Sequence, residues 1–283
     1  MVACFATTVF DHLYRKSGCT AADVAALRKA VYGRSVSIPL GLHNLEEILL
    51  GRRSAPQALA AQIRLVLSLS SSRMLVKSCE QILVDDVRSF AATGHASSPF
   101  LRGETQNAVS AGIAELLESD GEELGEDFVS VLEKARRQKE SLLAEARRLA
   151  QRGELAEPSS AEAGFDQHLR RNAPAVAEAL AERAGVVDDC RRRGIESLLA
   201  VRSVRMWAGG LTTLAYAQNV EGQSWRADYL AELIHAAVGA AAAEVFVSGE
   251  PQLAAPFSRA RPEGLRITDL RGFLASACSA TGS

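Results

Sequence analysis

The sequence predicts an α/β fold in which a parallel sheet is covered by helices and a large, mostly helical insertion interrupts it. Three observations lead to this prediction. Short apolar runs typical of buried strands recur near both ends of the chain, and helical patterns separate them. No pattern typical of a β-hairpin lies between them, and strands joined by helices form parallel sheets.

The first part of the chain, residues 1–104, alternates strands with helices. Thr20 is a suitable N-cap, because Asp23 three residues later completes a capping-box pattern. Gly51 is expected to follow the end of another helix, where glycine is favoured. The expected strands are 2–5, 36–40 and 74–76, and the expected helices are 20–31, 42–50, one beginning at Pro56, and 79–92.

The middle part, residues 105–221, is predicted to be the helical insertion. Apolar residues recur at helical spacing through 105–153, where the charges are first mostly acidic and then mostly basic. We expect most of these charges to solvate helix faces. A loop is expected at 154–164, which contains Pro158 and two serines, and helical sequence then continues through Tyr216.

The last part, residues 222–283, returns to alternating elements and completes the α/β domain. We expect a helix at 225–243, strands at 244–248 and 265–268, and a final helix at 269–277.

Composition excludes several classes of protein. The net charge of -2 excludes a strongly basic, histone-like protein. The five cysteines form no C-x-x-C pair, which argues against a disulfide framework or a structural zinc site and favours the cytoplasm. No apolar run reaches the roughly 18 residues of a membrane span, and the first residues lack the basic flank of a signal peptide. We therefore expect no membrane partner, and no Walker A or G-x-G-x-x-G motif indicates nucleotide binding.

Acidic residues follow or flank several predicted strands. Because the carboxyl ends of parallel strands form the ligand-binding edge of an open sheet, these residues are candidates for one shared site. Carboxylates that converge repel one another unless a cation compensates them, and oxygen ligands suit Mg²⁺ or Mn²⁺. The candidates are Asp11, Glu46, Glu47, Asp228, Glu232 and Glu250, together with Thr7, Thr8 and His235.

Four short motifs stand beside the predicted elements in a recognisable order. They are VACFATTVF at 2–10, EILLG at 47–51, ELIHA at 232–236 with Asp228 one turn earlier, and VFVSGE at 245–250. In this order the motifs resemble those of PIN-domain ribonucleases, over roughly residues 1–100 and 222–275. The resemblance does not cover the helical insertion.

The resemblance implies a metal-dependent endoribonuclease. It implies that Glu47, Glu232, Glu250 and Asp228 hold Mg²⁺ or Mn²⁺, and that a metal-bound hydroxide attacks the RNA phosphorus. Ala6, however, stands where the family has its first Asp, a central metal ligand. The glutamates at 232 and 250 replace aspartates, which lengthens each side chain by a methylene and disturbs the octahedral geometry that Mg²⁺ demands.

RNA is the expected partner, and two groups of residues are candidates to bind it. Thr7 or Thr8 would orient water or phosphate at the end of the first strand. The run Arg191, Arg192 and Arg193 would contact the phosphate backbone.

Two alternatives to the ribonuclease remain open at this point. One is a non-catalytic PIN-like module that holds RNA or a protein partner, with the helical insertion as contact surface. The other is an α-rich interaction protein whose resemblance to the family is accidental. Most candidates also have an ordinary structural explanation. Glu46, Glu47 and Asp228 suit the first turn of a helix, Asp11 a salt bridge with Arg15, Glu250 a turn, His235 the core, and the arginine run a solvated face. Glu232 is harder to explain in this way, because an unpaired carboxylate on a buried helix is costly.

Overall fold

The computed structural model describes residues 1–52, 54–70, 74–151, 164–219, 221–222 and 227–279. Most of the loop expected at 154–164 lies outside the described residues, and so do the first two residues of the helix expected at 225–243.

The strands form two small parallel sheets. One contains β1 (Ala3–Phe5), β4 (Val245–Ser248) and β5 (Arg266–Asp269), in the order β1-β4-β5. The other pairs β2 (Leu40–Gly41) with β3 (Leu75–Val76). Every residue of β1 and β4 is buried, as expected for a sheet with both faces covered.

The segment that leads into β2 lies beside β1. Val2 and Ser37 form a parallel bridge, and the amide of Ala3 donates to the carbonyl of Ser37 at 2.9 Å. The amide of Ser37 in turn donates to the carbonyl of Met1 at 2.9 Å. β1 therefore lies between this segment and β4, and the two sheets are neighbours in one layer of parallel backbone. The prediction of an α/β fold with a parallel sheet is confirmed.

Helices of the first part mostly match their predicted positions. The capping box of Thr20 and Asp23 is present, and Gly33 caps the end of the same helix. The expectation for Gly51 is wrong, because the helix continues through it to Arg52; a glycine inside a helix is tolerated at a cost of about 1 kcal/mol. The helices are α1 (Thr7–Arg15), α2 (Ala21–Tyr32), α3 (Leu42–Arg52), α4 (Pro56–Leu69) and α5 (Cys79–Thr93).

Helix α1 was not expected from the sequence. It begins directly after β1, with Ala6 as an extended N-cap residue that offers no side-chain cap. Val9, Phe10 and Leu13 are buried on one face of it, and this spacing is typical of an amphipathic helix. The short turn places Thr7 and Thr8 in the first turn of α1, at the carboxyl end of β1.

Among the described residues after α5, the regular elements other than β4 and β5 are helices. They are α6 (Gly103–Glu118), α7 (Glu126–Gln151), α8 (Phe165–Ala184), α9 (Val187–Arg193), a 3₁₀ helix (Ile195–Ala200), α10 (Arg202–Asn219), α11 (Ala227–Ala242), α12 (Pro251–Ala254), a second 3₁₀ helix (Ala255–Arg259) and α13 (Leu270–Ser279).

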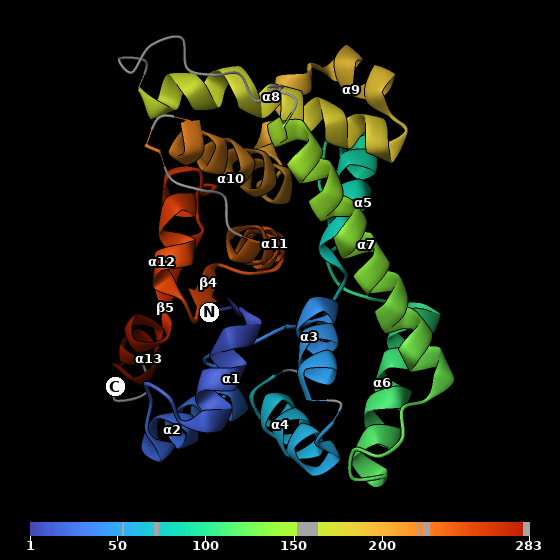
Figure 1. Ribbon diagram of the computed structural model, residues 1–283, viewed down its shortest axis with the longest axis vertical. Coiled ribbons are helices and arrows are strands. Elements are labelled where there is room, and N and C mark those ends of the chain that lie inside the picture. Colours follow the sequence, from blue (N-terminus) through green and yellow to red (C-terminus); the bar gives the residue numbers. More distant parts are fainter. Residues whose placement is uncertain (53, 71–73, 152–163, 220, 223–226, 280–283) are drawn as a thin grey trace.

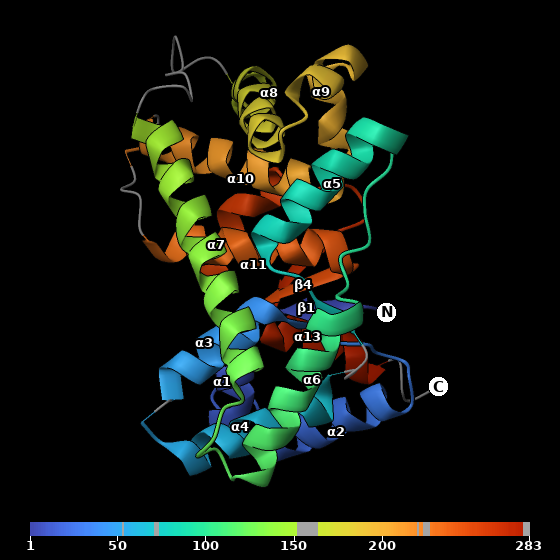
Figure 2. The same ribbon diagram turned by 90° about the vertical axis from the view of Figure 1, so that its right-hand side faces the viewer.

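The sheet lies between helices. Helix α11 packs on β1 and β4 from one side, and α1 and α13 pack from the other (Figure 2). Helices α8, α9 and α10 lie at one end of the molecule and α1 to α4 at the other (Figure 1). Among the described helices, none has a sufficiently long apolar stretch to cross a membrane.

Helix α7, which lies within the predicted insertion, packs beside the sheet region. It runs along one side of the molecule and packs against α3, α5 and α6 (Figures 1 and 2). The same hydrophobic core contains residues of the sheet, of α3 and of α7. The insertion is therefore packed directly against the helix that carries Glu46 and Glu47.

Candidate functional site

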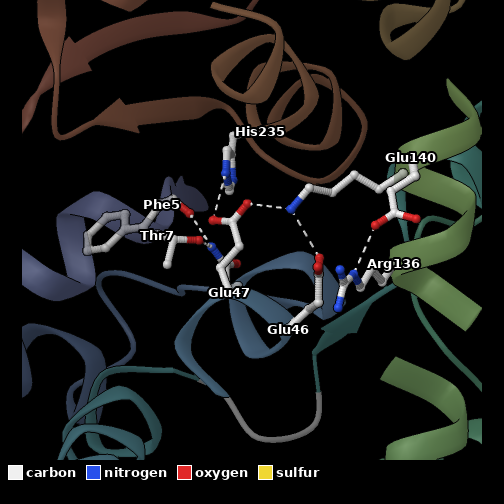
Figure 3. Close-up of polar contacts among 9 residues, drawn as sticks. Phe5, Thr7, Glu46, Glu47, Arg136, Glu140 and His235 are labelled. Carbon is white, nitrogen blue, oxygen red and sulfur yellow. Dashed lines mark hydrogen bonds and ion pairs between the residues drawn. The ribbon is translucent and has the colours of Figure 1, made fainter. Parts of the chain in front are cut away.

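Two adjacent carboxylates on α3 share one ammonium group from α7. Nζ of Lys139 donates to Oε2 of Glu46 at 3.1 Å and to Oε1 of Glu47 at 2.8 Å (Figure 3). The side chain of Glu46 is only 5% exposed, and that of Lys139 is 20% exposed. One ammonium group, largely removed from water, therefore lies against two neighbouring acids.

The second oxygen of Glu47 contacts a buried histidine. Oε2 of Glu47 lies 3.2 Å from Nε2 of His235, which α11 holds against the sheet (Figure 3). The ring of His235 meets that of His43 edge to face, with 4.4 Å between ring centroids. Glu47 is thus held between a lysine of the insertion and a histidine of α11.

Asn44 fixes α3 to the end of β1. Its Nδ2 donates to the carbonyl of Phe5 and to Oγ1 of Thr7, both at 3.1 Å, and its Oδ1 accepts from the amide of Gly41 at 3.1 Å. Because Asn44 is fully buried and three residues before Glu47, these bonds set the position of the acidic turn of α3 beside Ala6.

Glu232 lies on α11, three residues before His235, and is buried with 4% exposure. Its carboxyl group has a hydrogen bond with the side chain of Ser248, the last residue of β4. The oxygen Oε1 has no hydrogen-bond partner among the described residues. Besides His235, the charges that act on Glu232 are those of Glu250 and Glu47, so the three carboxylates belong to one electrostatic cluster.

Burial and charge determine the protonation of this cluster. Burial opposes ionisation of Glu47, but His235 and Lys139 outweigh it and hold the pKa of Glu47 well below its usual range. Burial would lower the pKa of His235, yet the Glu47 carboxylate raises it overall. The pKa of Glu232 is raised, chiefly by burial, and the pKa of His43 is lowered by burial and by the charge of His235. Glu47 and His235 are therefore the ionic pair, and His43 is neutral.

Several buried polar atoms around this cluster have no hydrogen-bond partner among the described residues. A buried polar atom without a partner is costly and calls for a bound water or ligand. The backbone of Gly249 lies close to one of these atoms, the hydroxyl oxygen of Thr8: a Cβ added at position 249 would be 2.5 Å from it. The unpaired atoms are Oγ1 of Thr8, Oε1 of Glu232, Nδ1 of His235, and both ring nitrogens of His43.

The structure brings some predicted site residues together and places others elsewhere. Glu47 contacts His235 between α3 and α11, and Glu232 lies one turn before His235 on α11. Glu250 follows β4 at the start of α12, where Gln252 donates to it at 3.3 Å. Thr7 contacts Asn44, as described above. Asp228 is exposed in the first turn of α11, and Asp11 accepts from Gln62 at 2.9 Å and pairs with Arg15.

The arginine run is not part of this cluster. It lies on α9, at the end of the molecule far from α3 (Figure 1). Arg191 pairs with Glu178 at 2.6 Å, Arg192 pairs with Asp189, and Nε of Arg193 donates to the carbonyl of Ala91 at 2.8 Å. These contacts tie α9 to α8 and to the end of α5.

The residues as arranged do not fit a divalent metal ion. Within the described part of the chain, no three His, Cys, Asp or Glu side chains are placed to hold one. The methyl group of Ala6 supplies no oxygen at the end of β1, and both oxygens of Glu47 already have cationic or histidine partners.

Sequence reasoning missed Lys139 and gave no role to Asn44 or His43. Lys139 had a usable signal: it lies four residues after Ala135 and three before Leu142, both buried, so it belongs to the inner face of α7. A charged residue on a buried helix face needs a partner. Asn44 comes shortly after the second predicted strand, near the expected site. Its hydrogen bonds to Phe5 and Thr7 could not be predicted, because they depend on how α3 packs against β1.

The Glu47–His235 pair predicts a pH dependence of stability. The folded state raises the pKa of His235 above its ordinary value of 6.5, so it retains a proton that the unfolded chain releases. This stabilisation is full below pH 6.5 and is lost as pH rises through the folded value, about 1.4 kcal/mol for each pKa unit. Urea unfolding at pH 6 and pH 8 measures it. Glu47→Gln is expected to reduce the difference, and an unchanged difference would contradict the assignment.

Comparison of the chain with family models, with curated proteins and with solved structures returned no match.

Proposed function

We propose that this protein is a PIN-like α/β module of the metal-dependent ribonuclease lineage that binds single-stranded RNA without cutting it. The observation that carries the proposal is the placement of two buried acids near the carboxyl ends of β1 and β4: Glu47 contacts His235, and Glu232 bonds to Ser248, the last residue of β4. This is where an open parallel sheet binds its ligand.

The arrangement of the strands supports the PIN-like part of the proposal. β1 lies inside the layer, with β4 on one side and the segment leading into β2 on the other. The motifs that resemble the family therefore come together in space, although they are far apart in the sequence. Ala6 occupies the end of this inner strand.

Ala6 and Lys139 support the absence of cleavage. A carboxylate at position 6 would be the family's central ligand, and alanine cannot replace it. Lys139 already compensates Glu46 and Glu47. A site with these two features has its negative charge balanced by protein groups.

A basic residue at the rim of the site is the candidate RNA contact. Arg136 is exposed on α7, and together with Glu46 it lines a pocket of about 140 Å³ between α3 and α7. It lies one turn before Lys139 and pairs with Glu140 at 2.9 Å, an exposed pair that is easily exchanged for a phosphate (Figure 3).

The test is binding of a fluorescent single-stranded RNA at 50 to 200 mM salt, with a cleavage assay in Mn²⁺ alongside. Arg136→Glu is expected to weaken binding and to reduce the slope of log K against log salt by about 0.7. Arg192→Glu is the matched control and should bind as wild type does. Absence of RNA binding at low salt would contradict the proposal in favour of a protein partner, and metal-dependent cleavage by the wild type would contradict its non-catalytic part.

The unpaired polar atoms favour a second candidate, an active metal-dependent endoribonuclease. Oε1 of Glu232 and Oγ1 of Thr8 are buried without a described partner, as expected where a bound group completes a site. This candidate requires Lys139 to leave the carboxylates so that a metal ion can bind them. RNA cleavage by the wild type in Mn²⁺ is the result that would support it.

A further inference from the structure

We propose that the ammonium group of Lys139 is a built-in cation, which occupies the acidic site in place of a divalent metal ion. The inference rests on the proposed function, because it concerns the same carboxylates. It goes further by stating what balances their charge and how the site becomes a metal site again.

The geometry of Lys139 differs from that of an ordinary surface lysine. Its ammonium bridges two carboxylates of consecutive residues, at 3.1 and 2.8 Å, and Glu47 reaches His235 with its other oxygen. Sequence-adjacent carboxylates on a helix point in different directions, so a shared cation draws them together. The lysine comes from α7, more than ninety residues away along the chain.

Burial makes this bridge necessary. Two acids with side chains only 5% and 26% exposed repel each other and lose hydration, so they need a positive charge or must take up a proton. Both carboxylates lie within hydrogen-bonding distance of Nζ of Lys139, and this arrangement favours its charged form. The ammonium thus performs the electrostatic role that a cation has in such a site.

Removal of the ammonium leaves a set of oxygen ligands. Glu46 and Glu47 lose their shared counter-ion, and Oε1 of Glu232 is already buried without a described partner. Carboxylate oxygens that lack a counter-ion are the ligands that Mn²⁺ and Mg²⁺ prefer. The proposal therefore predicts that a neutral side chain of similar length at position 139 creates a divalent cation site.

The experiment titrates Mn²⁺ into the full chain and follows the unbound ion by electron paramagnetic resonance. Lys139→Met is expected to bind Mn²⁺ at least tenfold more tightly than wild type, in line with the roughly 10–100-fold effects of residues around metal sites. Lys134→Met removes an exposed charge from the same helix and is the matched control. If the two variants bind Mn²⁺ equally, the proposal is overturned.

Two further variants test the mechanism. Lys139→Arg keeps the charge and should bind Mn²⁺ no more tightly than wild type does. Glu47→Gln combined with Lys139→Met should cancel the gain, since it removes a ligand oxygen. Retention of the full gain in the double variant would show that Mn²⁺ binds elsewhere, against the proposal.

A measurement on the wild type guards against a variant that does not fold. Acetic anhydride at limiting concentration, followed by peptide mass spectrometry, should modify Lys139 at least tenfold more slowly than Lys134. Equal rates would contradict the bridge. The Mn²⁺ titration and the lysine acetylation contain no RNA. A failure of the protein to bind RNA therefore overturns the proposed function alone, and a negative result in these two experiments overturns only the role of Lys139.

Discussion

Replacement of Ala6 by Asp and of Lys139 by Met in the same chain is expected to raise Mn²⁺-dependent cleavage of single-stranded RNA about 100-fold over wild type. The first change supplies a carboxylate at the end of β1, and the second removes the ammonium that competes with a metal for Glu47. Single residues at metal sites change affinity or activity by roughly 10–100-fold, and two act here. Cleavage of a fluorophore–quencher RNA measures the rate.

The new aspartate is expected to fit the fold. Ala6 is the N-cap residue of α1, with φ −63° and ψ 154°, and it provides no side-chain cap. Aspartate is among the preferred N-cap residues, because its carboxylate accepts hydrogen bonds from the first amides of the helix. The backbone is therefore already suitable for an aspartate.

The matched controls separate the contributions of the two positions. Ala6→Asp alone is expected to give a smaller gain, because Lys139 still pairs with Glu46 and Glu47. Addition of Glu47→Gln to the double variant should abolish the gain. If the double variant binds Mn²⁺ tightly yet leaves RNA intact, the site is a metal site but the ribonuclease lineage is the wrong interpretation.

The second large effect concerns stability. Glu47→Gln is expected to lower the free energy of unfolding by about 2–4 kcal/mol at pH 7, because removal of one partner of a buried ion pair leaves the other uncompensated. Lys139 would keep only Glu46, and His235 would lose its only carboxylate partner within hydrogen-bonding distance among the described residues. Urea unfolding followed by circular dichroism measures the change.

An exposed ion pair on α7 provides the comparison. Arg136 and Glu140 lie 2.9 Å apart with side chains 54% and 59% exposed, so Glu140→Gln should cost less than about 1 kcal/mol. Equal destabilisation by Glu140→Gln and Glu47→Gln would show that the Glu47 cluster contributes no more than a surface pair, contrary to the site described here.

Local sequence signals were sufficient for much of the fold. The capping box of Thr20 and Asp23 and the proline that begins α4 act within one turn of the chain, so the sequence alone predicts them. Apolar runs likewise located all five strands approximately, including β4. Helix α1 was not predicted, because only Ala6 separates it from β1 and no capping side chain marks its first residue.

The sequence predicts some residues of the candidate site but not the contacts that join them. Glu47 and Glu232 follow from strand ends and helix positions, which local patterns reveal. The contact of Lys139 with both acids of α3 depends on how α7 crosses α3, and no pattern in 105–221 specifies that crossing. The composition of the arginine run suggested phosphate binding; the structure places the run on α9, in ion pairs with Glu178 and Asp189 and away from α3 (Figure 1).

The position of Mn²⁺ in anomalous diffraction from crystals soaked in Mn²⁺ tests the central claim most directly. In wild-type crystals the account predicts Nζ of Lys139 within hydrogen-bonding distance of both Glu46 and Glu47, with no anomalous peak between them. In Ala6→Asp/Lys139→Met crystals it predicts a peak bounded by Glu47, Glu232 and the new aspartate. A peak at this place in the wild type, with Lys139 turned away, would contradict the account.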